Sequence, residues 1–115
     1  MRTTFEGPAI LPGYAYQLRL EAGSDLFPED ARFLAHLRTT PSSDQVLAVV
    51  TTETGGFVRI NDRELDLVLS AAQTSILPLG RVVLDIIRAD LDPLQHLGLF
   101  LELPVLQPVT RDILP

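Results

Sequence analysis

Three acidic residues form the first pattern in this chain that could do chemistry. Asp62, Glu64 and Asp66 are spaced two apart, so on a strand their side chains share one face. Oxygen ligands of this kind are those that Ca²⁺ prefers, although the segment lacks the glycine-containing loop of an EF-hand. The same spacing is typical of a strand face exposed to water. We therefore predict a solvated face, with a calcium-dependent ligand-binding module as the alternative.

Asp85 and the two histidines are the other candidates for a chemical role. Asp85 lies in an otherwise apolar segment, where a half-buried carboxylate acts either as an acid or base or as a structural acceptor. We favour the structural role. His36 and His96 lie in separate segments, and no cysteine accompanies them as it does in many zinc sites.

Established catalytic motifs are absent from the sequence. The chain has no cysteine, no Gly-x-Ser-x-Gly turn, no phosphate-binding P-loop and no Gly-x-Gly-x-x-Gly. The sequence therefore predicts that the protein is not an enzyme, with no catalytic residues, no metal and no cofactor.

Composition and charge limit the class of protein further. The 115 residues are 46% hydrophobic, which suits a single domain with a core of its own. The net charge is -6, and the nine basic residues are all arginines that are scattered singly along the chain. Because nucleic acids and anionic membranes attract clustered positive charge, we expect neither as a direct partner. The N-terminus lacks the apolar core of a secretory signal, so synthesis in the cytoplasm is expected.

Hydrophobic alternation with a period of two predicts the elements that must position these residues. A helix competes at 31–38, which is rich in Ala, Leu and Arg, but its short length between proline-bearing turns favours a strand. The central position among the strands is expected for 81–90, because both of its faces are largely apolar. Strands are predicted at 16–21, 31–38, 46–52, 57–61, 64–69, 81–90 and 96–103, with an edge strand at 105–107 between two prolines.

A single helical turn interrupts the strands. Ser70 and Gln73 have the spacing of a capping box, and Pro78 ends the helix because it cannot donate to the backbone ladder. The whole pattern predicts an all-β fold, an antiparallel Ig-like β-sandwich of seven to eight strands with one short helical turn at about 70–77. The expected organisation is an extended arm at 1–13, the sandwich at 14–111 and a tail at 112–115.

Several short motifs in the second half follow one another in an order that resembles a family of small bacteriophage virion domains. That family includes the N-terminal anchor domain of upper-baseplate proteins in tailed phages. The resemblance covers about half of the chain. The matching segments are Gly56 to Ile60, Leu67-Val68-Leu69-Ser70 with Thr74, Leu77-Pro78-Leu79-Gly80, Val83-Leu84-Asp85-Ile86 and Val109-Thr110-Arg111.

The resemblance implies a structural role. The chain would be an anchor or adaptor in the tail, baseplate, neck or head accessory layer of a virion, made in the host cytoplasm. Its partners would be other virion proteins in a homo-oligomer or symmetric assembly.

Apolar residues that lie outside the sandwich pattern are the candidate interface. They lie in the arm, in the predicted edge strand and in the tail, and they either bind neighbouring subunits or fold back on their own core. These residues are Phe5, Ile10, Leu11, Val105, Leu106, Ile113 and Leu114.

Overall fold

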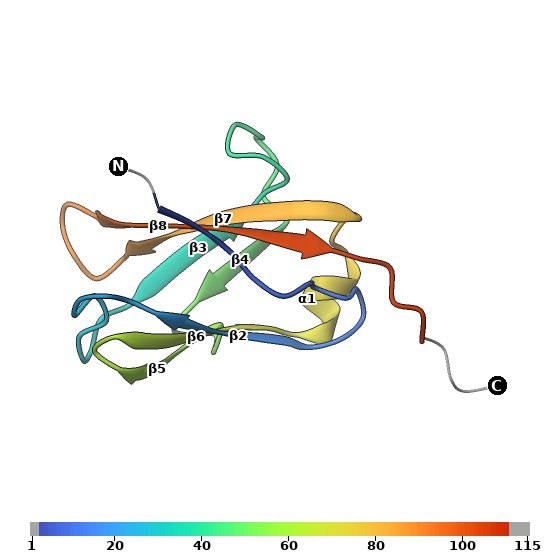
Figure 1. Ribbon diagram of the computed structural model, residues 1–115. Coiled ribbons are helices and arrows are strands. Elements are labelled where there is room, and N and C mark those ends of the chain that lie inside the picture. Colours follow the sequence, from blue (N-terminus) through green and yellow to red (C-terminus); the bar gives the residue numbers. More distant parts are fainter. Residues whose placement is uncertain (1–2, 111–115) are drawn as a thin grey trace.

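The computed structural model describes residues 3–110 and has an all-β fold in which two sheets pack as a sandwich (Figure 1). Within this range, eight strands and one short helix are present. Their bounds are β1 (Thr3–Glu6), β2 (Tyr16–Glu21), β3 (Phe33–Leu37), β4 (Ala48–Thr51), β5 (Phe57–Asn61), β6 (Glu64–Leu69), α1 (Ala71–Ser75), β7 (Gly80–Arg88) and β8 (Gln95–Val105). The predicted β-sandwich with one helical turn is confirmed.

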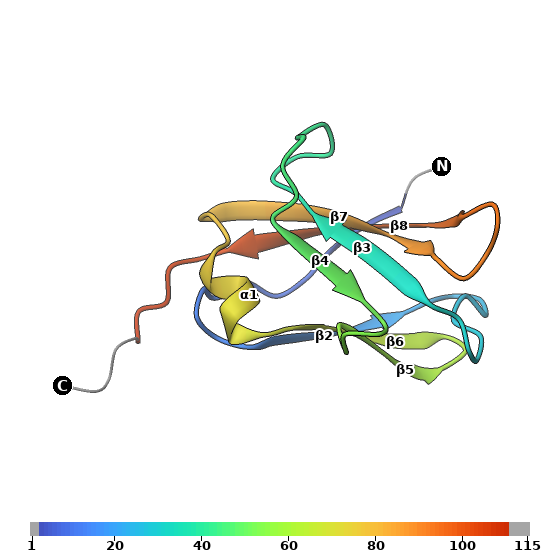
Figure 2. The same cartoon turned by 180° about the vertical axis from the view of Figure 1, so that it is seen from behind.

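The described strands divide into a larger and a smaller sheet. The larger has the order β1-β8-β7-β3-β4, and the smaller has the order β2-β6-β5. Strands β2 to β8 pair antiparallel with their neighbours, four in one layer and three in the other, while β1 adds to β8 in parallel. Seen from behind, α1 lies at one end of the sandwich, where the chain passes from β6 to β7 (Figure 2).

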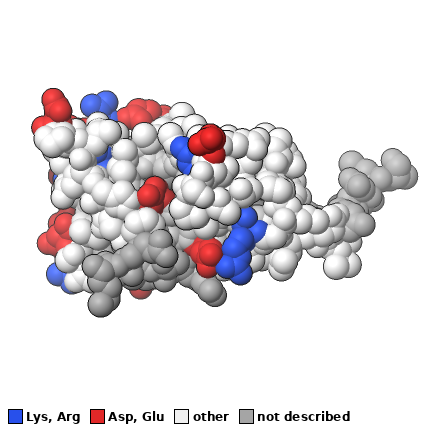
Figure 3. Space-filling view, turned by 90° about the horizontal axis from the view of Figure 1, so that it is seen from above, with Lys and Arg blue, Asp and Glu red and all other residues white. Residues whose placement is uncertain are grey.

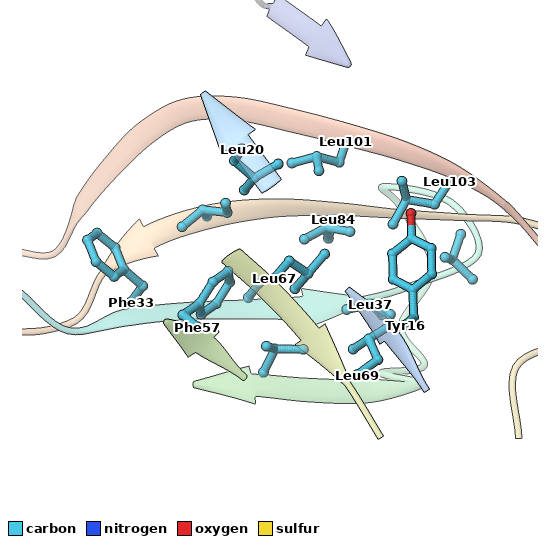
Figure 4. Close-up of a cluster of buried hydrophobic side chains, with 14 of the residues drawn as sticks. Tyr16, Leu20, Phe33, Leu37, Phe57, Leu67, Leu69, Leu84, Leu101 and Leu103 are labelled. Carbon is cyan, nitrogen blue, oxygen red and sulfur yellow. The ribbon is translucent and has the colours of Figure 1, made fainter. Parts of the chain in front are cut away.

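Alternating side chains from both sheets fill the space between the layers. In β6, Leu65, Leu67 and Leu69 are fully buried, as their period of two predicts. In β3, burial alternates from Phe33 to Leu37, which confirms a strand over a helix in this segment. Figure 4 shows leucines and phenylalanines of the two layers meeting in one core. Burying each such side chain contributes about 1.5–3 kcal/mol to folding.

Strand β7 is central in the larger sheet, as predicted. It lies between β8 and β3. One of its faces is buried in the core through Val82, Leu84 and Ile86. The other face, which carries Val83 and Asp85, is partly exposed on the outside of the sheet.

The capping box at the start of α1 is confirmed. The Ser70 hydroxyl accepts a hydrogen bond from the backbone N–H of Gln73 at 3.1 Å. In return, the Gln73 side-chain oxygen accepts from the N–H of Ser70 at 2.9 Å. Each bond satisfies a backbone donor that has no partner within the helix.

The prediction of a separate edge strand at 105–107 was wrong. β8 continues through Pro104 to Val105, and it lies between β7 and β1. The Pro104 carbonyl accepts from the N–H of Ile10, so the backbone of Pro104 faces the N-terminal segment. Because the missing N–H of this proline is on that side, it does not interrupt the pairing of β8 with β7.

Candidate functional site

The predicted interface residues fall into three groups. Ile10 and Val105 are fully buried and form a parallel bridge with each other, so they belong to the core of the domain. Leu11 and Leu106, the next residues along the chain, are exposed. The side chain of Phe5, together with Ile113 and Leu114, lies outside the described residues.

Exposed apolar side chains gather where Leu11 and Leu106 lie. The segments that carry these side chains, namely the loop before β2, the stretch after α1 and the stretch after β8, lie at one end of the sandwich (Figure 1), and we call these side chains the α1-end cluster. Isolated exposed apolar residues are common on proteins, whereas a group of them marks an interaction surface. In the described part of the chain, the cluster consists of Leu11, Tyr14, Ile76, Leu79, Leu106 and Val109, with exposures from 37% to 94%.

Thr74 connects the segments that carry this cluster. Its side chain is fully buried. The hydroxyl accepts from the N–H of Gly13 at 3.1 Å and donates to the carbonyl of Tyr14 at 2.8 Å. In addition, the Leu106 N–H donates to the Ile10 carbonyl at 3.0 Å. The loop before β2, the helix and the segment after β8 are therefore joined at one end of the sandwich.

Two tyrosines add to this connection. The Tyr14 hydroxyl donates to the carbonyl of Thr110 at 2.5 Å. The Tyr16 hydroxyl donates to the carbonyl of Pro8 at 2.7 Å, and burial raises the pKa of Tyr16 to about 12. Tyr16 is buried, as its alternation with the core leucines predicts.

Sequence reasoning missed Ile76 and Leu79 as members of the cluster. The capping box and Pro78 predict only where the helix begins and ends, and they indicate nothing about the exposure of these two side chains. Both are apolar residues in a short connection, outside any alternating pattern. Their position in a connection could have predicted that they are exposed, because connecting segments run over the surface.

The acidic residues of the smaller sheet are held by hydrogen bonds. Asp66 is 4% exposed, although a solvated position was predicted. Arg19 donates to it from the neighbouring strand β2, and Gln17 donates at 2.8 Å. These bonds, that from Arg19 above all, outweigh the effect of burial and lower the pKa of Asp66.

Of the other two acids, Glu64 shares Arg19 with Asp66, whereas Asp62 lies apart from them. Asp62 lies in the turn before β6 rather than on the strand, and it is paired with Arg59. Glu64 accepts from Asn61 at 2.6 Å and from Arg19 at 3.3 Å. The prediction that all three side chains share one strand face was therefore wrong, because the strand begins after Asp62. Among residues 3–110, no group of three or more His, Cys, Asp or Glu is placed to hold a metal ion.

The structure brings the two histidines to the outer face of the larger sheet, near Asp85. The pairing of β3 with β7 sets His36 opposite Asp85. His96 Nε2 lies 2.9 Å from an Asp85 oxygen, and its ring stacks on Phe100. Asp85 is thus hydrogen-bonded to a histidine of the neighbouring strand β8. A groove of about 500 Å³ runs over this face and is lined by residues of β3, β7 and β8 and by Pro41.

Charged side chains of both signs are scattered over the outer face of the larger sheet. Figure 3 shows the face over the larger sheet, where blue and red groups lie close together and no blue patch forms. One of these pairs is Arg81 with Glu102, at 2.9 Å. No helix among the described residues is long and apolar enough to cross a membrane.

The comparisons with known proteins found no relatives. No family model matches the chain, and neither a curated protein nor a solved structure is significantly similar to it.

Proposed function

We propose that this protein is a structural component of a bacteriophage or phage-derived virion. It is an anchor or adaptor in the tail, baseplate, neck or head accessory layer, and it acts by contacts with other virion proteins. The α1-end cluster is the observation that carries this proposal. A group of exposed apolar side chains at one end of a small domain is what a neighbouring protein covers in an assembly.

The short motifs that resemble the phage virion family also favour the α1-end cluster as the binding surface. Thr74, Leu79 and Val109 belong to three different motifs that are separate in the sequence. In the fold, Thr74 holds the segments around α1 together, while Leu79 and Val109 lie in the α1-end cluster. If the α1 end of the domain binds other virion proteins, these motifs are expected to lie together at that end.

The polar residues favour a structural role over a catalytic one. Asp66 is paired with Arg19, and Asp85, which lines the open groove over the larger sheet, bonds to His96 and remains about half exposed to water. Catalytic groups more often lie in a cleft that excludes water and shifts their pKa. We therefore assign these polar side chains to holding the strands together rather than to catalysis.

Purified particles test the proposal. The tagged chain is produced in the phage system that encodes it, the particles are separated on a density gradient, and the tag is labelled for electron microscopy. We expect the wild type on the particles and the double variant Ile76→Asp/Leu79→Asp in the soluble fraction. Leu94→Asp is the control, because Leu94 is also exposed but lies in the loop between β7 and β8, outside the cluster. Particles without the wild-type protein would overturn the proposal.

A further inference from the structure

The edges of the two sheets differ in how well they are protected. In the described part of the chain, β1 and β4 are the edges of the larger sheet, and β2 and β5 are those of the smaller. An unprotected edge pairs readily with another strand, so proteins shorten, bend or cover their edges. β1 and β4 have four residues each, and the pairing of β5 with β6 contains an irregularity.

The edge of β4 is also covered by the chain itself. The Val49 carbonyl accepts from the Gln73 side chain at 3.5 Å, and the Thr51 carbonyl accepts from the N–H of Gly56 at 2.9 Å. These contacts occupy acceptors that an added strand would need.

The edge of β2 is covered only at its first half, where Gly7 lies close to Leu18 and the Tyr16 hydroxyl donates to the Pro8 carbonyl. Its six residues pair with β6 in an unbroken register, and the strand contains neither proline nor lysine. The N–H of Ala22 donates to the Arg63 carbonyl, so alternation in an antiparallel pair turns the backbone groups of Gln17, Arg19 and Glu21 to the open side. No backbone hydrogen bond joins these groups to another described residue on that side.

An apolar crevice lies beside this edge, between the two sheets. Its volume is about 150 Å³, and its apolar walls include Leu18 and Leu20 of β2, Leu99 and Leu101 of β8, and Phe27. An added strand would place its inward side chains against this crevice while its backbone pairs with β2. Main-chain pairing and a pocket for alternate side chains are the two components of recognition by strand addition.

We propose that the occupant of this edge is β2 of a second copy of the chain, paired antiparallel about a two-fold axis at Leu20. In this register, Arg19 lies opposite Glu21 of the second copy, and Glu21 lies opposite its Arg19. Both are exposed, and the Glu21 carboxylate has no hydrogen bond or ion pair with a described residue. Opposite charges on facing strands favour pairing.

The alternation of backbone groups limits the other two-fold registers. Centring the axis on Gln17, Leu18, Arg19 or Glu21 also aligns the hydrogen-bonding groups. The axis at Arg19 or at Glu21 sets like charges opposite each other, and the axis at Leu18 or at Gln17 leaves Arg19 without a facing glutamate. The register centred on Leu20 instead sets opposite charges together on the outer face and apolar residues together on the inner face. The two smaller sheets then become one continuous sheet of six strands. This inference rests on the β2 edge alone and does not depend on the proposed function.

Sedimentation velocity at protein concentrations up to about 1 mM tests the pairing. We expect a dimer of the wild type. Glu21→Arg sets arginines against each other and is expected to raise the dimer dissociation constant about tenfold or more. Asp44→Arg is the matched control, because it makes the same change in net charge in the exposed loop between β3 and β4. It is expected to dimerise like the wild type.

A second variant and a second measurement separate the interface from folding. Glu21→Pro removes an outward N–H that the pairing with β6 does not use, so the domain is expected to fold and the dimer to be lost. Amide exchange by NMR should show Gln17, Arg19 and Glu21 protected at high concentration and unprotected after dilution. A wild type that is monomeric throughout, or a dimer that both Glu21 variants leave unchanged, would overturn the proposal.

Discussion

Asp66 illustrates how the environment of a single residue differs from what its spacing suggests. The alternation in β6 correctly places it on the outer face of the smaller sheet, opposite the core leucines. The arginine and the glutamine of the neighbouring strand nevertheless cover it, and its side chain is buried there. Cross-strand neighbours are determined by register, which cannot be read from one segment of the sequence.

The Asp66–Arg19 pair makes stability depend on pH. The pKa of Asp66 is lowered in the folded protein, mainly by the hydrogen bond from Arg19. In the unfolded chain it is about 3.9. The pair therefore adds stability above about pH 4, and this contribution is lost as the pH falls through the folded-state pKa. Asp66→Asn is expected to lower the free energy of unfolding by about 1 kcal/mol at pH 7, because Arg19 is exposed and screened.

Urea unfolding between pH 7 and pH 2 checks this prediction. The difference between wild type and Asp66→Asn should narrow below about pH 4. Some acid sensitivity should persist in the variant, because Arg88 and the backbone N–H of Arg32 lower the pKa of Asp90 in the same direction. A difference that is constant with pH would show that the charge of Asp66 does not contribute.

At the scale of elements, periodicity predicted most of the strands and the single helix. Alternation at 16–21 and 64–69 matches the observed bounds of β2 and β6, because the inner face of each strand faces the core, and the extended run 57–61 matches β5. The local chemistry of Ser70 and Gln73 was likewise enough to predict the helix cap. These features depend on near neighbours, which a sequence displays directly.

Pairing between distant elements could not be predicted in this way. The parallel addition of β1 to β8 joins residues almost a hundred positions apart, and it has no local signature. Likewise, the Ile10 N–H bonds to the carbonyl of Pro104 near the end of β8, across more than ninety positions of sequence. For the same reason, the sequence identified Leu11 and Leu106 as candidates but did not separate them from the buried Ile10 and Val105.

Thr74 is the residue through which α1 holds the loop before β2. Thr74→Val keeps the shape of the side chain but removes the hydroxyl, which leaves the N–H of Gly13 and the carbonyl of Tyr14 without their partner. We expect the free energy of unfolding to fall by about 1–3 kcal/mol, the usual cost of unsatisfied polar groups inside a protein.

Thermal unfolding followed by circular dichroism measures this effect. Thr74→Ser is the matched control, because it keeps the hydroxyl and loses only a methyl group; its cost should be about 1 kcal/mol. If the serine variant is as unstable as the valine variant, packing rather than hydrogen bonding makes Thr74 important.

At the scale of the whole molecule, the two proposed surfaces lie apart. Strand β2 leaves the neighbourhood of α1 at Tyr16 and runs toward the other end of the sandwich, where it ends at Glu21 (Figure 1). The α1-end cluster is apolar and presents side chains. The β2 edge presents backbone groups between charged side chains. A domain with two such surfaces can pair with its own copy through one and attach to a different protein through the other.

If the two surfaces act independently, a substitution in one should remove its own interaction and leave the other interaction intact. Ile76→Asp/Leu79→Asp should remove the protein from virions and leave the dimer intact, because β2 runs away from α1 and its Glu21 end lies toward the other end of the sandwich (Figure 1). Glu21→Arg should weaken the dimer about tenfold or more and leave a folded domain whose α1-end cluster is unchanged, so attachment to particles should persist in weaker form. The two effects are measured on the same preparations, by sedimentation velocity and by gradient fractionation of particles. If one variant abolished both properties while remaining folded, the two surfaces would act as a single interface, and the dimer would be the unit that attaches to the particle.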